Sequence, residues 1–128
     1  DQVAYACASR YSGHYAVTLS VDQVIFKEPI HVGELVTFLA SINHVGRTSM
    51  EVGIRVEAQN IRQRSVRHTN SCYFTMVAID NGKPAAVPPL PLNTDMQRCR
   101  FAAAEQRKAQ RLQAVHTHRC EADDNNQN

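Results

Sequence analysis

The stretch TSMEVGIRVEA, residues 48–58, decides the expected fold because its apolar and polar residues alternate. The apolar parity consists of Met50, Val52, Ile54, Val56 and Ala58. The other parity carries charged side chains at 51, 55 and 57. Successive side chains of a strand point to opposite faces, so the pattern predicts a strand with one apolar and one polar face. A long strand of this kind belongs to an antiparallel sheet that is covered on one side.

Three further segments are expected to join this strand in the sheet. They cover residues 17–26, 35–44 and 66–79, and a polar turn follows at 80–84. The apolar parity of the first segment changes between Val21 and Val24, which predicts a bulge near residues 22–23. The short connection at 45–47 predicts a hairpin. Because the segments follow one another without a helix-length gap, we expect a four-stranded antiparallel meander.

Helical patterns stand on both sides of these strands. Residues 1–11 predict a helix that Gly13 ends, with Ala and Cys on an inner face that permits close approach to the sheet. Thr94 and Gln97 match a capping box that opens a helix through about Val115. The expected units are therefore 1–92, a basic helix at 93–115, and a disordered tail at 116–128. The fold class is α+β.

The beginning of the chain is unusual, because no residue precedes Asp1 to begin the first helix. Proteins rarely open abruptly in an uncapped helix of this composition. We therefore expect the chain to be a fragment from which a strand and the start of the helix are missing.

Size and composition exclude several classes of protein. A chain of 128 residues is expected to form one domain with a real core. It has no apolar run of about 20 residues and no signal-peptide pattern. A net charge of +2 argues against a dedicated nucleic-acid-binding protein. The four cysteines lack CxxC spacing, which favours reduced thiols and a cytoplasmic location.

Several short segments together resemble the hotdog-fold acyl-CoA thioesterases, and most of all the bacterial acyl-CoA hydrolases of the cytosolic type. The resemblance extends from Asp1 to about Leu112. Any one of the segments alone would be a weak signal. They are DQVA at 1–4, VTLSVD at 17–22, Phe26, PIHVGE at 29–34, GRTSMEV at 46–52 and HTNS at 68–71.

This resemblance implies a hotdog fold, in which an antiparallel sheet wraps around a central helix, with a further helix at the C-terminus. It also implies hydrolysis of fatty acyl-CoA to a free fatty acid and CoA, without a cofactor. Members of the family form dimers through their sheets and commonly hexamers, with the active site at the dimer interface. Neither a membrane nor a nucleic acid is expected as a partner.

Asp1 falls on the catalytic carboxylate of the family. Thioester hydrolysis needs a base that activates water, or a carboxylate that attacks directly, together with donors for the oxyanion. The asparagine and the glycine-rich segment of the family pattern have no counterpart here. From the residues alone, the ordinary alternative is that Asp1 is a solvated helix cap.

The resemblance also implies contacts to the acyl and pantetheine parts of the substrate. These residues are Thr18, Leu19, Ser20, Val21, Thr48, Ser49 and Met50. The alternative for the hydroxyl groups is ordinary packing across strands.

Basic side chains form the candidate site for the CoA phosphates, because guanidinium groups match phosphate oxygens. The candidates are Arg47, in a turn, and Arg107, Lys108 and Arg111 in the second helix. For each of them singly, an exposed and solvated role is the alternative.

Other functions remain open from the sequence. A hotdog module can bind acyl-CoA or a nucleotide without turnover, as a regulatory domain. Dehydratase chemistry on this fold typically pairs a histidine with an acid, and no histidine lies near Asp1 on its helix. His116, His118 and Cys120 could ligate a metal, but a tail without supporting contacts does not predict a metal site.

Overall fold

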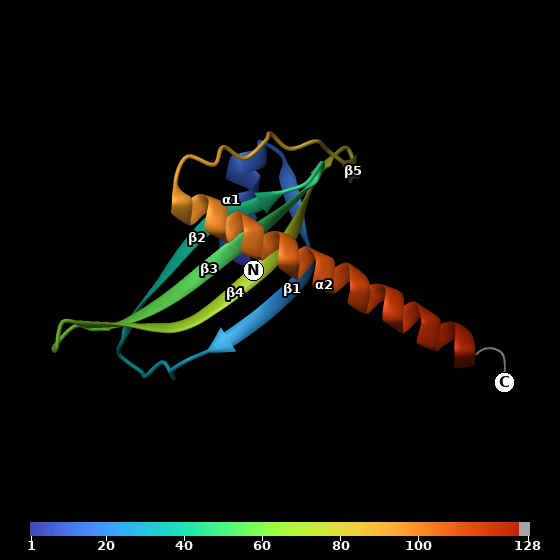
Figure 1. Cartoon of the computed structure of the whole chain (residues 1–128). Coiled ribbons are helices and arrows are strands. Elements are labelled where there is room, and N and C mark those ends of the chain that lie inside the picture. Colours follow the sequence, from blue (N-terminus) through green and yellow to red (C-terminus); the bar gives the residue numbers. More distant parts are fainter. Residues whose placement is uncertain (126–128) are drawn as a thin grey trace. The chain divides into compact units, whose positions relative to one another are not determined.

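The computed structural model describes residues 1–125, except for the side chains of Gln23 and of residues 116–125. The chain divides into two compact units, Asp1–Pro91 and Leu92–Asn128. The elements, labelled in Figure 1, are α1 (Gln2–Ser12), β1 (Tyr15–Phe26), β2 (Leu35–Val45), β3 (Ser49–Asn60), β4 (Ser65–Asp80), β5 (Lys83–Pro84) and α2 (Asp95–Asn125).

The first unit is a five-stranded antiparallel sheet whose long strands run in the order β1-β4-β3-β2, with β5 paired to β4. The expected meander is therefore correct for β2, β3 and β4 and wrong for β1. The chain leaves β1 and crosses to the opposite edge of the sheet before β2 begins. Local patterns identify strands, but they do not say which strands pair when the partners are distant in sequence.

Helix α1 packs across all four long strands, and its contact with them forms the core (Figure 1). Ala4 and Ala8 have no exposed surface, which allows the helix backbone to approach the sheet closely. The apolar face predicted for residues 50–58 is confirmed, because every member of its apolar parity is buried. The polar face is exposed at Arg55, but Glu51 is only 6% exposed, since its carboxylate accepts a hydrogen bond from the buried Asn43 side chain. Helix α1 ends as expected at Gly13, which adopts the left-handed conformation with φ of 73°.

Strand β1 departs from regular pairing twice. The register shift between Asp22 and Ile25 confirms the expected bulge. A second shift lies between Thr18 and Ser20, so Leu19 is an extra residue in this strand. A bulge redirects the neighbouring side chains, and bulges of this kind occur frequently beside active sites.

The second unit contains α2, whose N-terminus has the expected capping box. The Gln97 N–H donates to Thr94 Oγ1 at 3.1 Å, and the Thr94 N–H donates to Gln97 Oε1 at the same distance. The helix extends to Asn125 instead of ending at Val115. Residues 116–125 hold no glycine or proline that would stop a helix, and residues 126–128 of the expected tail lie outside the described part. Over the described residues, neither helix is long and apolar enough to cross a membrane.

Candidate active site

Asp1 and Thr18 come together where the start of α1 faces β1. Asp1 is the N-cap residue of α1, but its side chain makes no capping hydrogen bond. Instead, Thr18 Oγ1 lies 2.8 Å from Asp1 Oδ1 and donates to it. Thr18 Oγ1 also lies 3.3 Å from Met76 Sδ, a weak acceptor on the partner strand. A bond to a charged carboxylate is the stronger of the two, so the carboxylate is the main acceptor of this hydroxyl.

A hollow of about 400 Å³ opens beside this pair. It is lined by Asp1, Gln2 and Tyr5 from α1, by Ala16, Val17 and Thr18 from β1, and by Met76 from β4. Its wall is largely apolar, and Asp1 is part of it. In the single chain Asp1 is exposed.

The expected substrate-binding residues of β1 lie directly beyond Thr18. Leu19, at the bulge, is 67% exposed, and Val21 is also exposed. Ser20 is half-buried, and within the described residues its Oγ has no hydrogen-bond partner. A buried hydroxyl without a partner costs free energy unless a water or another group satisfies it.

Residues 47–50 form the turn into β3 and its first positions. Arg47 is exposed and its carbonyl accepts from the Val87 N–H, while the Thr48 carbonyl accepts from the Ala78 N–H. Ser49 is half-buried at the start of β3. Met50, by contrast, is 1% exposed and lies in the core opposite Met76. These four residues thus present one exposed arginine, a half-buried threonine and serine, and one core side chain.

The other basic candidates, Arg107, Lys108 and Arg111, all lie on α2 in the second unit. Each is half-buried within the structure. The side chains of His116, His118 and Cys120 lie outside the described residues. Cys7, Cys72 and Cys99 are free thiols, and burial raises the pKa of the Cys7 and Cys72 thiols.

The sequence did not single out Tyr5 or Met76, although both line the hollow. Tyr5 lies one helical turn after Asp1, a spacing that places both residues on one face of α1. That spacing was a usable signal. Met76 could not be found in this way, because its position opposite Thr18 depends on the pairing of β1 with β4.

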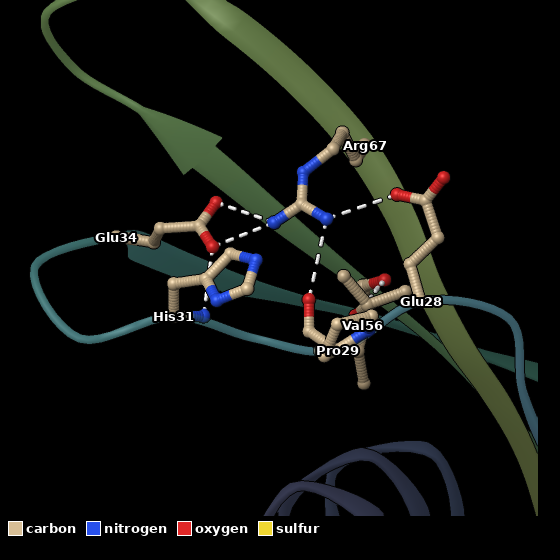
Figure 2. A network of polar contacts seen from close by, with 7 residues as sticks. Glu28, Pro29, His31, Glu34, Val56 and Arg67 are labelled. Carbon is tan, nitrogen blue, oxygen red and sulfur yellow. Dashed lines mark hydrogen bonds and ion pairs between the residues drawn. The ribbon is translucent and has the colours of Figure 1, made fainter.

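A second polar network surrounds Arg67, near the start of β4 (Figure 2). Arg67 Nη2 lies 2.6 Å and 2.7 Å from the two carboxylate oxygens of Glu34, and Arg67 Nη1 lies 2.9 Å from Glu28 Oε2. The Glu34 carboxylate also accepts from the His31 N–H at 2.8 Å. These hydrogen bonds hold the pKa of Glu34 below its ordinary value, and those from Arg67 have the largest effect. The network ties the β1–β2 connection to β4, far from Asp1 in the fold.

Comparison with known proteins gives the family. The model of the Thioesterase superfamily matches residues 1–65, and the chain belongs to this superfamily. The protein VdlD of Helicobacter pylori is 55% identical over 111 residues, which are 87% of this chain and 64% of that protein. An uncharacterized acyl-CoA thioester hydrolase of Bacillus subtilis is 31% identical over 87% of this chain and 65% of its own length. The chain thus spans somewhat less than two thirds of these relatives.

Solved structures confirm the hotdog fold expected from the resemblance. A hexameric acyl-CoA thioesterase in its apo form has a TM-score of 0.86 and 34% identity, over 90% of this chain and 74% of that one. The acyl-CoA hydrolase of Staphylococcus aureus, solved with butyryl-CoA, CoA and CoA disulfide, has a TM-score of 0.81 and 30% identity, over 95% of this chain and 77% of its own.

Proposed function

We propose that this chain forms the thioesterase part of an enzyme that hydrolyses fatty acyl-CoA to a carboxylic acid and CoA. The observation that supports this most is the hydrogen bond from Thr18 to Asp1 in the wall of a largely apolar hollow, in a member of the Thioesterase superfamily. Other relatives have names of the same kind, including the cytosolic acyl coenzyme A thioester hydrolase of the rat.

The spacing of the two residues supports the same assignment. In the Staphylococcus aureus acyl-CoA hydrolase, alanine variants were made of an aspartate and of a threonine that lies seventeen positions further along that chain. Thr18 lies seventeen positions beyond Asp1 here. We therefore infer that the two residues act as a pair.

In the proposed reaction, Asp1 acts as the general base. The hydroxyl of Thr18 occupies Oδ1 and orients the carboxylate, which leaves Oδ2 to take a proton from water. The water oxygen forms a bond to the thioester carbonyl carbon, the carbon–sulfur bond breaks, and the proton on Asp1 passes to the leaving thiolate. Direct attack by Asp1, with an anhydride that water then cleaves, is the alternative use of the same carboxylate.

The substrate contacts follow from this placement. The thioester would lie in the hollow beside Asp1, with Leu19, Ser20 and Val21 along the neighbouring strand. Thr48, Ser49 and Met50 remain predicted contacts, and of these Met50 is placed beneath the surface. Arg47, Arg107, Lys108 and Arg111 remain candidates for the phosphates of CoA.

We further propose that a second copy of the chain completes the site. β1 stands at one edge of the sheet, and its exposed apolar side chains include Val17, Leu19, Val21 and Phe26. An unpaired strand edge with apolar side chains is a template for association. A second sheet along β1 would cover Asp1, which is otherwise exposed, and the hexameric thioesterase neighbours support an oligomer of this kind. The cytoplasmic location stays a prediction from the sequence.

The proposal is tested by incubating the complete gene product with acyl-CoA and following the free thiol with a chromogenic thiol reagent. Release of one thiol and one carboxylic acid for each acyl-CoA consumed is the expected result. Calorimetry on the same sample distinguishes an enzyme from the alternative, a non-catalytic regulatory module. Such a module would bind acyl-CoA without releasing thiol. Binding without turnover would contradict the proposed enzyme.

A further inference from the structure

Two hollows lie side by side along the face of α1 that is turned toward β1. The first contains Asp1 and Thr18 and has a volume of about 400 Å³. The second has a volume of about 530 Å³ and reaches the end of α1, where Gly13 and His14 form part of its wall. Tyr5 lines both hollows and is the one residue that their two walls share.

The position of Tyr5 on the helix explains why it stands between them. It follows Asp1 by four residues, and its N–H donates to the Asp1 carbonyl at 2.9 Å. Residues four apart lie on the same face of a helix, about 6 Å apart along the axis. Ser9 lies a further turn along and belongs to the second hollow. The aromatic ring is thus one turn away from the carboxylate, in the direction of the second hollow.

The two hollows differ in chemistry. The first has an apolar wall of Ala16, Val17 and Met76, whereas the second includes His14, Asp80 and Asn81. An aliphatic chain gains free energy in the first, and in the second it meets apolar surface on Tyr15 and Ile79 beside the polar groups. Tyr5, a residue with 42% of its surface exposed, belongs to the walls of both hollows and so stands where these surroundings meet.

We propose that Tyr5 determines the longest acyl chain that the enzyme accepts. This inference rests on the proposed thioesterase function. With the thioester held beside Asp1, the acyl chain extends along α1 until it meets the ring of Tyr5. Chains that end before the ring bury all of their methylene groups in the first hollow. Longer chains must displace the ring or leave the groove, so their transition states are bound less well.

The test is the profile of kcat/KM over a series of straight-chain acyl-CoAs, from acetyl-CoA to palmitoyl-CoA, in the complete gene product. The Tyr5→Ala variant joins the two hollows, so the optimum is expected to shift to longer chains. The ratio of long-chain to short-chain kcat/KM should rise about 10-fold or more, the scale at which hydrophobic pockets discriminate chain length. Tyr5→Trp enlarges the barrier, and the optimum should shift to shorter chains.

Two further variants separate the ring from other effects. Tyr5→Phe keeps the ring without its hydroxyl and should keep the wild-type optimum. Tyr15→Ala removes a tyrosine that lines only the second of these two hollows and should also keep it. Thermal unfolding of each variant checks the fold independently of activity.

The outcomes distinguish the inference from the function on which it rests. If Tyr5→Ala and Tyr5→Trp change kcat/KM by the same factor for every chain length, Tyr5 does not set specificity and the inference is overturned while the thioesterase assignment stands. If the wild-type protein releases no thiol from any acyl-CoA, the proposed function falls, and the inference falls with it.

Discussion

Thr18 donates its hydroxyl hydrogen to Asp1 across 2.8 Å, and this bond joins the N-cap residue of α1 to the strand that follows the helix. The bond takes up one oxygen of the carboxylate and fixes its orientation. The same hydroxyl rests 3.3 Å above the sulfur of Met76, which is itself fixed in the core. The core of the sheet thus supports the position of the proposed catalytic base through a single threonine.

Replacing Thr18 with valine keeps the shape of the side chain and removes the hydroxyl. A hydrogen bond to a charged group is worth about 1.5–3 kcal/mol. We therefore expect kcat to fall about 10- to 100-fold, because the carboxylate loses its orientation. Steady-state kinetics with an acyl-CoA measure this effect. Thr18→Ser is the matched control and should retain most of the activity; equal losses in both variants would contradict a role for the hydroxyl.

Leu19→Lys tests the association proposed for β1. A lysine at this bulge would place charge in an apolar interface, so the expected result is a smaller assembly and a parallel loss of thiol release. Light scattering after size exclusion gives the mass of the assembly. Ile61→Lys places the same charge on an exposed apolar residue in the β3–β4 turn and should leave the mass unchanged. A wild-type mass for Leu19→Lys would exclude β1 as the interface.

Gly53→Ala tests a close contact between β3 and β2. A Cβ atom on Gly53 would lie 2.3 Å from Asn43 Nδ2. The Asn43 side chain is buried and is bonded to Ser41 and Glu51, so it cannot move without losing these bonds. We expect a loss of about 1–3 kcal/mol in the free energy of unfolding, measured with urea.

A double-mutant cycle gives the control for this contact. When Asn43 is already alanine, the cost of Gly53→Ala should be much smaller, because the obstructing amide is absent. Additive effects of the two changes would show that the clash is not the cause.

The Glu34–Arg67 contact predicts a specific dependence of stability on pH. Arg67 lowers the pKa of Glu34 below its ordinary value of 4.5. The unfolded chain therefore takes up a proton on this residue at higher pH than the folded chain does. The stabilisation is present above pH 4.5 and is lost as the pH falls from there through the pKa of the folded state.

Glu34→Gln isolates this contribution. The difference in free energy of unfolding between wild type and variant should be constant near neutral pH and should shrink below pH 4.5. Urea titrations at a series of pH values measure it. A difference that stays constant down to pH 3 would mean that the ion pair does not stabilise the fold in this way.

The sequence predicts the strands well because alternation is a local property. Residues 50–58 show this alternation on their apolar face. The end of α1 at Gly13 was predictable for a similar reason, because a glycine directly after a helical stretch is also a local signal. The pairing of β1 with β4 could not be derived from alternation, because partners distant in sequence leave no local pattern. Helix α2 extends beyond its predicted end at Val115, because residues 116–125 contain no glycine or proline that would break it.

The candidate site was predictable only in part, because local patterns identify single residues but not the contacts between distant segments. Asp1 and Thr18 were both singled out, but as members of separate groups, a base and a substrate contact. Their hydrogen bond depends on how α1 crosses β1 and on the irregular register at Leu19, and neither is encoded in a local period. Helical spacing alone could have placed Tyr5 beside Asp1. Placing Met76 beside Thr18 requires the register of β1 against β4.

The most direct measurement is single-turnover hydrolysis of an acyl-CoA by the Asp1→Asn variant, with CoA binding followed by calorimetry on the same sample. Removing a general base costs typically at least about 100-fold in rate. We expect a loss of that size with CoA affinity close to wild type, while Asp95→Asn, an exposed aspartate at the start of α2, should hydrolyse the substrate normally. Hydrolysis at nearly the wild-type rate by Asp1→Asn would contradict the assignment of Asp1 as the catalytic carboxylate.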